Sequence, residues 1–261
     1  MFPVLCFGQY TSIPDQNFEQ ALIDFGYDDV IDGKVLTANI NSVDSLSLER
    51  KKISDLIGIE DFIALSFLNC NTNQLTNLDV SKNTALTRLV CSRNKLTSLD
   101  VSGCTALTQL ACGYNKLTSL DVSGCTALTF LGFHKNQLTN LDVSKNTALI
   151  SLKFRNNQLT KLDVSKNTAL TKLYFGSNKL TSLDVSQNTA LTLLYCTSNQ
   201  LNSLDVTKNI ALTSLHCSSN QLTSLDVSKN TALSELFCDG NKFNCEALKA
   251  KYGIKNKSIW Q

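Results

Sequence analysis

Cysteine and histidine are the residues of this chain with the widest chemical range, so their spacing is considered first. The sequence has ten cysteines and two histidines in 261 residues. No two cysteines have the CxxC spacing of zinc and redox motifs. Six of the cysteines recur in one register that phenylalanine fills in between: Cys70, Cys91, Cys112, Phe133, Phe154, Phe175, Cys196, Cys217 and Cys238. Because Cys interchanges with Phe, we expect buried thiols that act as small apolar groups, with disulfides between neighbours as the alternative.

The histidines do not predict a catalytic site. His134 and His216 lie four repeats apart in the sequence, roughly 19 Å if each repeat advances by one strand spacing. Two groups at that separation cannot share a metal ion or a proton. The sequence also contains no phosphate-binding glycine loop, nucleophile elbow or paired metal motif. We therefore expect no enzymatic activity and no cofactor.

An acidic segment, DDVIDGKV at residues 28–35, partly matches a calcium-binding loop. Asp28 and Asp32 fill its first and fifth ligand positions, but Val30 and Asn39 stand where a third ligand and a bidentate glutamate belong. A calcium ion needs most of those oxygens. Asp28 and Asp32 are therefore weak calcium candidates, and we favour an acidic turn without metal.

A 21-residue repeat must position both histidines and most of the cysteines. Its landmark leucines and asparagines fall one period apart, at Leu86, Leu107, Leu128, Leu149, Leu170, Leu191, Leu212 and Leu233, and at Asn94, Asn115, Asn136, Asn157, Asn178, Asn199, Asn220 and Asn241. A fixed period of this length predicts a solenoid, in which each coil buries its apolar side against the next. Within one unit, the spacing of Leu86, Leu89, Cys91 and Leu96 predicts a short strand followed by a turn.

Polar residues recur at fixed points of the unit as well. Asn94 stands where the chain turns inward, and an amide can donate and accept, so we expect an inward Asn column that satisfies buried turns. Residues 96–106 nearly repeat the first half and predict a second extended arc on the opposite side, with few helices. The equivalent position in this second arc is Asn83, Asn146, Asn167, Asn188, Asn209 and Asn230, but Cys104 and Cys125 in two neighbouring units.

A second-arc aspartate also repeats, at Asp79, Asp100, Asp121, Asp142, Asp163, Asp184, Asp205 and Asp226. Stacked like charges are unfavourable, so each carboxylate needs compensation. We expect turn N–H groups, the following hydroxyl or nearby lysines to provide it. A row of bound cations is the less favoured alternative.

The pattern LxxLxCxxNxLxxLDVSxNTA, repeated from Leu65 to Phe243, resembles the leucine-rich repeat superfamily, most closely its short bacterial 21-residue class with nested halves. The resemblance implies a mostly β solenoid with parallel strands on one face, short strand-like arcs on the other and small helical caps. Residues 43–56 fit the leucine spacing as a degenerate first coil, but Lys51 stands where the Asn belongs.

We expect four segments: residues 1–12 as a lead-in, 13–42 as an N-terminal helical cap, 43–243 as a solenoid of about ten coils, and 244–261 as a C-terminal cap. Asp15 and Asn244 are expected helix N-caps, and Trp260 is expected to close the C-terminal cap. The apolar run Met1–Phe7 indicates the remnant of a secretory signal peptide, with an apolar first strand as the alternative. No segment is long enough to span a bilayer.

The net charge of +2 is unevenly distributed. Residues 1–63 carry 4 basic and 11 acidic side chains, a net charge of −7, and the remaining residues carry +9. The repeats are therefore mildly basic, below the charge density of a dedicated nucleic-acid binder. We expect no nucleic-acid partner.

Sequence variation is confined to one face of the predicted solenoid. The third and fifth positions of the first strand differ among repeats, whereas the second arc reads Leu-Asp-Val followed by Ser or Thr throughout. Because the variable positions flank inward leucines, alternation places them on the exposed side of the sheet. Tyr174, Tyr195, His216 and Phe237 occupy one column there. A basic region beside this column contains Arg88, Arg93, Lys135, Lys153, Arg155 and Lys172, and Phe130 and Leu193 complete the candidate binding residues.

Exposed aromatic and arginine side chains are typical of binding hot spots. The alternative is that the stacked rings only stabilise neighbouring strands. Residues 13–22 resemble the cap that precedes the repeats in bacterial secreted and surface proteins. The resemblance thus implies a secreted or cell-surface, internalin-like module for adhesion or protein binding, with a protein partner favoured and a glycan possible. A spacer within a larger surface assembly is the competing hypothesis.

Overall fold

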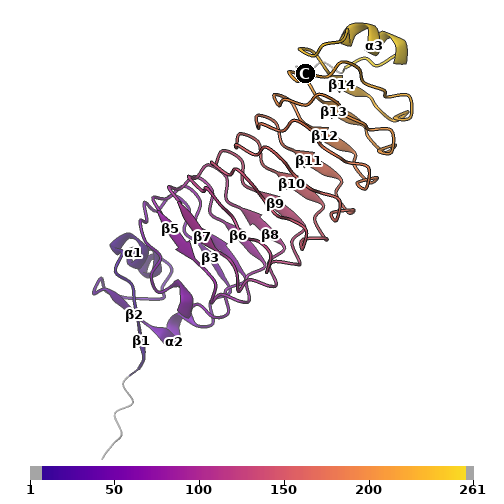
Figure 1. Ribbon diagram of the computed structural model, residues 1–261. Coiled ribbons are helices and arrows are strands. Elements are labelled where there is room, and N and C mark those ends of the chain that lie inside the picture. The colour runs from indigo at the N-terminus through magenta and orange to yellow at the C-terminus, as the bar shows by residue number, and fades with distance from the viewer. Residues whose placement is uncertain (1–7, 257–261) are drawn as a thin grey trace, which may run out of the picture.

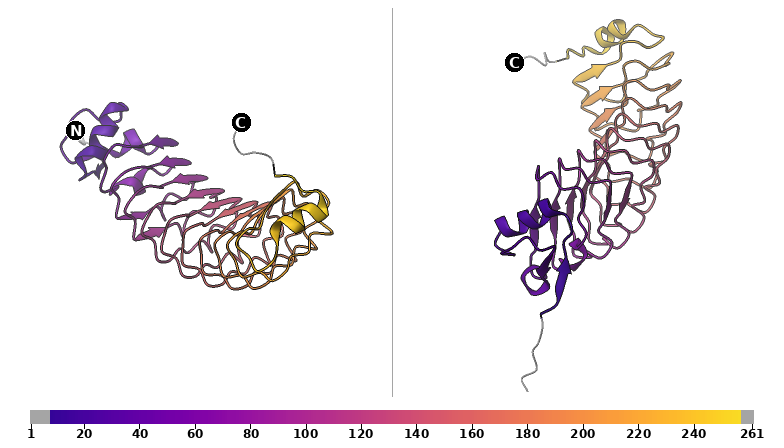
Figure 2. Two further views of the ribbon diagram at one scale, coloured as in Figure 1. Left: turned by 90° about the horizontal axis from the view of Figure 1, so that it is seen from above. Right: turned by 90° about the vertical axis from the view of Figure 1, so that its left-hand side faces the viewer.

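The structure, a computed structural model, describes residues 8–256. The expectations for Met1–Phe7 and for Trp260 lie outside these residues. Within them the chain winds into one elongated stack of coils with a helical cap at each end (Figure 1). The stack curves along its length, with the main sheet on the inner side of the curve (Figure 2).

A ten-stranded parallel sheet runs the length of the stack. Its register stacks identical repeat positions, so that Leu152 lies between Leu131 and Leu173. The strands are β3 (Ser45–Ser47), β4 (Phe67–Asn69), β6 (Arg88–Val90), β8 (Gln109–Ala111), β9 (Phe130–Gly132), β10 (Ser151–Lys153), β11 (Lys172–Tyr174), β12 (Leu193–Tyr195), β13 (Ser214–His216) and β14 (Glu235–Phe237). The predicted solenoid is confirmed. Strand β3 also confirms the degenerate first coil.

The second arc is less regular than the sequence predicts. Strands β5 (Asn77–Asp79) and β7 (Ser98–Asp100) pair in parallel, but after β7 no further second-arc strand occurs in the residues that the structure describes. The later arcs lie on the outer side of the curve, where successive coils are farther apart (Figure 2). They keep single backbone hydrogen bonds between coils, such as the one from Lys116 N to Leu96 O at 2.9 Å. The prediction of strand-like arcs therefore holds as strands only in the first coils.

Asp15 fastens the N-terminal cap to the stack. One of its carboxylate oxygens accepts the Asn17 and Phe18 N–H groups and begins α1 (Gln16–Asp24), as the sequence predicts. The other oxygen accepts from the backbone N–H and hydroxyl of Ser54, at 2.8 and 2.6 Å. The remaining elements of this region are β1 (Tyr10–Ser12), β2 (Lys34–Leu36), α2 (Thr37–Ile40) and the 3₁₀ turn η1 (Ile59–Asp61).

The C-terminal cap is helix α3 (Cys245–Tyr252), which Asn244 begins and Gly253 ends with a φ of 65°. A disulfide between Cys245 and Cys238 ties this helix to the end of β14. Asn256 bonds the N–H and C=O of Leu236 at 2.8 and 2.9 Å, and so occupies the open edge of the last strand. The cap therefore prevents further strand pairing at this end.

The cysteine register points into the core. Cys70, Cys91, Cys112, Cys196 and Cys217 are buried and free, whereas the expectation of a free thiol is wrong for Cys238. Burial raises the pKa of Cys70, Cys112 and Cys217 to about 12. These thiols stay protonated and act as apolar groups. In the middle coils the rings of Phe133, Phe154 and Phe175 stack at 5.5 and 5.8 Å between centroids.

The Asn column of the first turn bonds each coil to the one before it. The Asn157 amide nitrogen donates to the C=O of Phe133 and of Phe154, both at 3.1 Å, and its oxygen accepts the Leu138 N–H at 3.1 Å. One side chain therefore satisfies three buried backbone groups in two coils. The predicted inward column is confirmed, and the same pattern recurs at Asn115, Asn136, Asn178, Asn199 and Asn220.

The Asn column of the second arc uses only its donors. The Asn167 amide nitrogen bonds the C=O of Val143 and of Asn146 at 2.9 Å, but its oxygen has no partner among the residues described. A thiol can supply one such donor. Accordingly, Cys104 donates to Val80 O at 3.3 Å and Cys125 to Val101 O at 3.4 Å.

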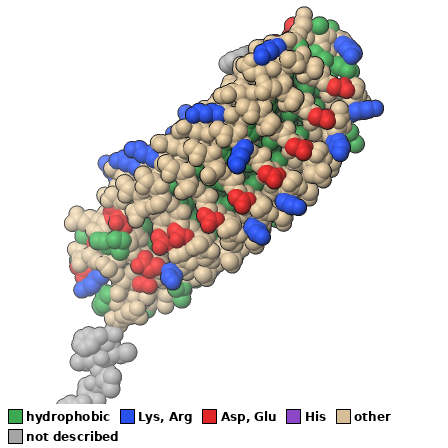
Figure 3. Space-filling view, viewed as in Figure 1, with side chains coloured by type: hydrophobic (Ala, Val, Ile, Leu, Met, Phe, Trp, Pro, Cys, Tyr) green, Lys and Arg blue, Asp and Glu red, His purple; other side chains and the backbone are tan. Residues whose placement is uncertain are grey.

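The repeated aspartates form an acidic row along the outer face, with lysines beside it (Figure 3). Asp163 accepts the Ser165 N–H at 2.8 Å, and this bond lowers the pKa of the carboxyl group. Equivalent bonds form at Asp79, Asp100, Asp121, Asp142, Asp184, Asp205 and Asp226. Within residues 8–256, no lysine lies within ion-pair distance of this row. Turn N–H groups and the hydroxyl of the following Ser or Thr therefore provide the expected compensation.

The two sides of a strand should differ sharply in their tolerance to substitution. Leu152 is fully buried, so Leu152→Ala should lower the free energy of unfolding by about 2 to 5 kcal/mol. Ser151→Ala, on the other side of the same strand, removes a hydroxyl oxygen that is buried without a hydrogen-bond partner among the residues described, so it should not lower the free energy of unfolding. Urea denaturation of both variants measures the difference. Equal losses would mean that the faces are reversed.

The two Asn columns should also differ. Asn157→Ala leaves the Leu138 N–H without a partner and removes one of the two donors at the carbonyls of Phe133 and Phe154. Asn167→Ala removes one of the two donors at the carbonyls of Val143 and Asn146, together with an oxygen that has no partner among the residues described, but leaves no N–H unpaired there. Asn157→Ala should therefore cost about 1 to 3 kcal/mol more. Chemical denaturation of the matched pair checks the order, and a larger loss for Asn167→Ala would contradict it.

Candidate functional site

All of the sequence-predicted binding residues lie on one surface, which we call the strand face. It consists of the outward side chains of the ten-stranded sheet and of the turns that directly follow its strands. Arg93 and Arg155 lie in the turns after β6 and β10. The others lie in strands, at Arg88, Phe130, Lys153, Lys172, Tyr174, Leu193, Tyr195, His216 and Phe237. Each is partly or fully exposed, so the predicted orientation is confirmed.

Four rings on successive strands form an aromatic strip: Tyr174, Tyr195, His216 and Phe237. Their centroids are 6.2, 4.8 and 4.5 Å apart in that order. Register pairing of β11 to β14 places them one above the other. The rings are thus stacked on one another, with interplanar angles of 26°, 24° and 32°, and each of them stays partly exposed.

Hydrogen bonds fix the middle of the aromatic strip. His216 Nε2 lies 3.0 Å from the Ser214 hydroxyl, which donates to Glu235 at 2.9 Å. Burial lowers the pKa of His216, Glu235 acts in the opposite direction, and Arg155 lowers it further. The imidazole is therefore neutral at pH 7 and behaves as part of the apolar strip.

Two glycines leave room for rings of the next coil. A Cβ atom at Gly176 would stand 3.0 Å from the Tyr195 ring, and one at Gly113 would stand 2.7 Å from the His134 ring. Side chains at these positions would displace both rings. Glycine at positions 113 and 176 is therefore needed for the His134 and Tyr195 rings to take their places on the strand face.

A second feature, which we call the basic hollow, lies beside the strip at the carboxyl ends of the strands. It has a volume of about 470 Å³ and is lined by Tyr114, His134, Lys135, Lys153, Arg155, Asn156 and Tyr174. The structure thus brings Lys153, Arg155 and Tyr174 together, as the sequence predicts. Arg88, Arg93 and Lys172 are not among the residues that line it.

Cation–ring contacts position the basic side chains. Arg93 and Lys135 come from the coils on either side of Tyr114, and they lie 4.5 and 4.7 Å from the centroid of its ring. Lys153 lies 4.9 Å from the centre of the Tyr174 ring. Arg155 lies 4.5 Å from the centre of the Tyr195 ring, which links the hollow to the aromatic strip.

Sequence reasoning missed Tyr114, His134 and Asn156. All three lie in turns, whereas the search concentrated on variable strand positions. A usable signal was present, because the turn column reads Arg93, Tyr114 and Lys135 where later coils have Ser177, Ser198 and Ser219. The break in that column marks the same coils as the hollow.

The hollow has a positive potential. Among the residues described, no carboxylate oxygen lies within 4.0 Å of the charged nitrogens of Lys135, Lys153 or Arg155. The pKa of His134 is lowered, first by burial and then by Lys135, Arg155, Arg93 and Lys153. Burial and the surrounding cations therefore both favour the neutral imidazole.

An apolar hollow of about 340 Å³ adjoins this region on β6, β8 and β9. Its lining includes Val90, Ala111 and Phe130, with Arg88 and Gln109 at its margin. Lys153 lies 5.5 Å from the centre of the Phe130 ring. Apolar surface therefore borders the basic hollow on one side, and the aromatic strip borders it on the other.

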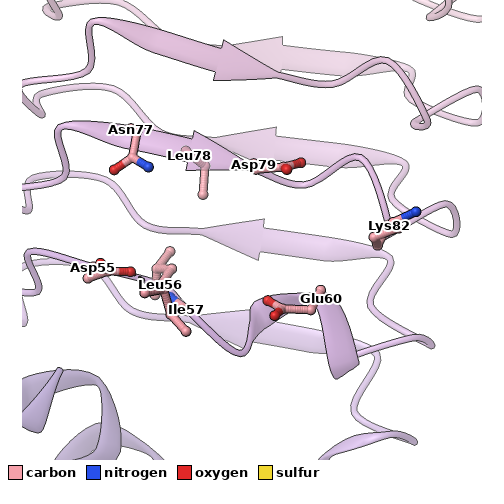
Figure 4. Close-up of a pocket in the computed structure, with 8 residues that line it drawn as sticks. All are labelled: Asp55, Leu56, Ile57, Glu60, Asn77, Leu78, Asp79 and Lys82. Carbon is pink, nitrogen blue, oxygen red and sulfur yellow. Dashed lines mark hydrogen bonds between the residues drawn. The ribbon is translucent and has the colours of Figure 1, made fainter. Parts of the chain in front are cut away.

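A separate hollow of about 360 Å³ lies near the N-terminal cap, where Asp55, Glu60 and Asp79 line it (Figure 4). These carboxylates already accept turn N–H groups, from Ile57, Gly58 and Ser81. The arrangement serves the local turns and offers no convergent ligand chemistry.

The acidic turn around Asp28 and Asp32 is organised by Glu19. Its buried Oε1 accepts the N–H groups of Asp32, Gly33 and Lys34 at 2.9, 2.6 and 3.1 Å. Asp32 pairs with Lys34 at 3.4 Å. Within residues 8–256, the potential metal ligands that lie close enough to share an ion are not in this turn; they are Asp239, Cys245 and Glu246. Cys245 is already bonded to Cys238 in the disulfide.

The chain is similar to several solved bacterial proteins. It is 41% identical to a domain of InlJ from Listeria monocytogenes, with a TM-score of 0.85, over 94% of this chain and 56% of that one; that domain is described as functional and as including a cysteine ladder. A leucine-rich repeat protein of Leptospira interrogans is 25% identical with a TM-score of 0.73, over 78% of this chain and 56% of that one. This chain thus spans little more than half of either.

Internalin InlF of Listeria monocytogenes is 22% identical with a TM-score of 0.57, over 95% of this chain and 96% of that one, and it shares the fold. No family model matches the chain. No curated protein sequence matches it either. None of the helices within residues 8–256 is long and apolar enough to cross a membrane.

The histidine pKa values test the electrostatics of this surface. Both His134 and His216 should titrate below 6.5, measured from the pH dependence of their imidazole NMR signals. Arg155→Gln should raise both pKa values, because the guanidinium lowers each of them, and Lys145→Gln on the outer face should not. Because the folded state binds these protons more weakly than the unfolded state, the free energy of unfolding should fall as pH drops below 6.5. Unchanged titration in Arg155→Gln would contradict the proposed potential.

Proposed function

Because this chain is a bacterial internalin-like leucine-rich repeat protein, we propose that it is a non-enzymatic, secreted or surface-displayed module that binds a protein partner through the strand face. The observation that carries the proposal is the concentration of varied, ordered and exposed side chains on that face. The outer face repeats one short motif instead. Adhesion is the biological role that this placement favours.

The aromatic strip and the basic hollow have the composition of a binding hot spot. Tyrosine and arginine dominate the energetics of protein interfaces because they supply large contact area and planar hydrogen bonding. Tyr174, Tyr195 and Arg155 contact one another or lie on adjacent coils. Their rings are already stacked before a partner arrives, so little conformational entropy is lost on binding.

The strand face is also rigid. Each coil is bonded to the next by the sheet and by the Asn column, so strand side chains keep fixed spacing along the stack. A partner would meet a preorganised surface rather than a mobile loop. A preorganised surface with varied side chains supports a role in binding a partner. A simple spacer would not need different side chains in each coil.

The disulfide supports a location outside the reducing cytosol. Cys238 and Cys245 join the last strand to the C-terminal cap. Structural disulfides persist in oxidising compartments and are rare in cytosolic proteins. The chain's similarity to the InlJ domain of Listeria monocytogenes is in keeping with this placement.

A comparative capture experiment tests the proposal. Wild-type protein, a strand-face variant (Tyr174→Ala, Tyr195→Ala, Phe237→Ala and Arg155→Glu) and an outer-face control (Lys82→Ala, Lys145→Ala, Lys166→Ala and Lys208→Glu) are immobilised and exposed to host-cell and bacterial envelope extracts. Quantitative mass spectrometry should find a protein that wild type and control retain and that the strand-face variant loses at least about tenfold, equivalent to about 1.4 kcal/mol. Circular dichroism verifies that all three are folded. Equal retention of every protein would leave only the spacer hypothesis.

A further inference from the structure

We infer that the partner surface seated at the basic hollow is an acidic peptide segment, with clustered Asp or Glu carboxylates flanked by apolar side chains. This inference rests on the proposed function and specifies its chemistry. It follows from the charge, the geometry and the immediate surroundings of the hollow.

The first argument is uncompensated charge. Lys135, Lys153 and Arg155 line one hollow, and Arg93 lies beside it over the Tyr114 ring. In the described part of the chain none of the four is paired with a carboxylate within 4.0 Å. By contrast, the repeated aspartates of the outer face each accept a turn N–H. Converging cations without internal partners repel one another, and an anionic ligand removes that repulsion.

The second argument is that the cations are held in place. Arg93 and Lys135 lie on the Tyr114 ring, Lys153 lies on Tyr174, and Arg155 lies on Tyr195. A guanidinium stacked on a ring keeps its N–H edge free, and that edge matches a carboxylate bidentately. The ring contacts therefore orient donors for carboxylates and reduce the entropy lost when they bind.

The third argument is the backbone conformation at which these side chains are carried. Arg93, Tyr114 and Lys135 have φ values of 56°, 54° and 53°, in the left-handed region. This region costs a non-glycine residue about 1 to 2 kcal/mol. The same turn position holds serine in later coils and Gly240 at the end. In the first coils it holds Arg50 and Thr72, so the left-handed turn is a property of the whole stack. Its contribution at the hollow is to fix the direction in which Arg93, Tyr114 and Lys135 leave the backbone.

The surroundings favour a peptide over a uniformly charged polymer. A polysaccharide or nucleic-acid chain gains from positive charge that continues along its length. Here the hollow is bordered by the apolar hollow at Val90, Ala111 and Phe130 and by the aromatic strip, which ends beside Glu235. Charged and apolar subsites alternate along the stack, as they do in the sequence of a protein segment.

The test measures fluorescence anisotropy with a labelled 15-residue peptide that has two Asp and two Glu residues between Leu and Phe, against its Asn and Gln counterpart. The acidic peptide should bind wild type at least about tenfold more tightly than the amide peptide at 50 mM salt, and higher salt should reduce the difference. Lys135→Gln with Lys153→Gln and Arg155→Gln should weaken the acidic peptide at least about tenfold.

A matched control removes the same charge elsewhere. Lys82→Gln with Lys145→Gln and Lys166→Gln, on the outer face, should change acidic-peptide affinity less than about twofold, because those lysines lie away from the hollow. Three results would overturn the inference: equal affinity for the two peptides, an equal loss in the outer-face control, or stronger competition from a heparin fragment or a single-stranded oligonucleotide than from the unlabelled acidic peptide.

The inference and the proposed function fail separately. If a partner captured from extracts depends on Tyr174 and Tyr195 but the charge-neutral triple variant keeps its affinity, the strand face binds a partner of different chemistry and only the inference is wrong. If no partner depends on the strand face at all, the proposed function fails, whatever the peptide shows.

Discussion

The satisfaction of buried turns between successive coils is the constraint on which this structure depends. A coil of 21 residues cannot enclose its own backbone polar groups, and the turn after each strand faces the core. The Asn157 side chain solves this by bonding carbonyls in its own coil and in the preceding one, and by accepting an N–H from the preceding coil. Every coil therefore completes its neighbour, and the repeat period cannot change without leaving buried groups unpaired.

This constraint divides the residues of each repeat into two classes. Inward leucines and asparagines are determined by stacking, whereas outward strand residues contact only one another and any partner. The freedom has limits, because a ring on one coil requires space on the next, as Gly176 provides for Tyr195. The strand face is therefore a set of ordered columns, in which substitutions in adjacent coils depend on each other.

Much of this could be predicted from the sequence, and the failures have physical causes. Leucine spacing and the Asn register determine the sheet, because both are repeated many times and reflect local packing. The disulfide could not be predicted, because Cys238 shares its register with five free cysteines and differs only in facing Cys245 of the cap. The basic hollow was predicted only in part, since Tyr114 and His134 lie in turns and their proximity to Lys153 depends on how coils stack.

The two faces show how the same fold treats charge in opposite ways. On the outer face, each aspartate forms a turn bond such as Asp163 to Ser165 N, so a row of like charges is compatible with a stable stack and needs no ligand. On the strand face, Lys153 and Arg155 rest on aromatic rings, which orient them without neutralising them. Ring contacts preserve the positive charge and its donors, whereas a carboxylate from the chain itself would occupy both. The difference in compensation, rather than the number of charges, distinguishes the structural row from the surface that we propose binds a partner.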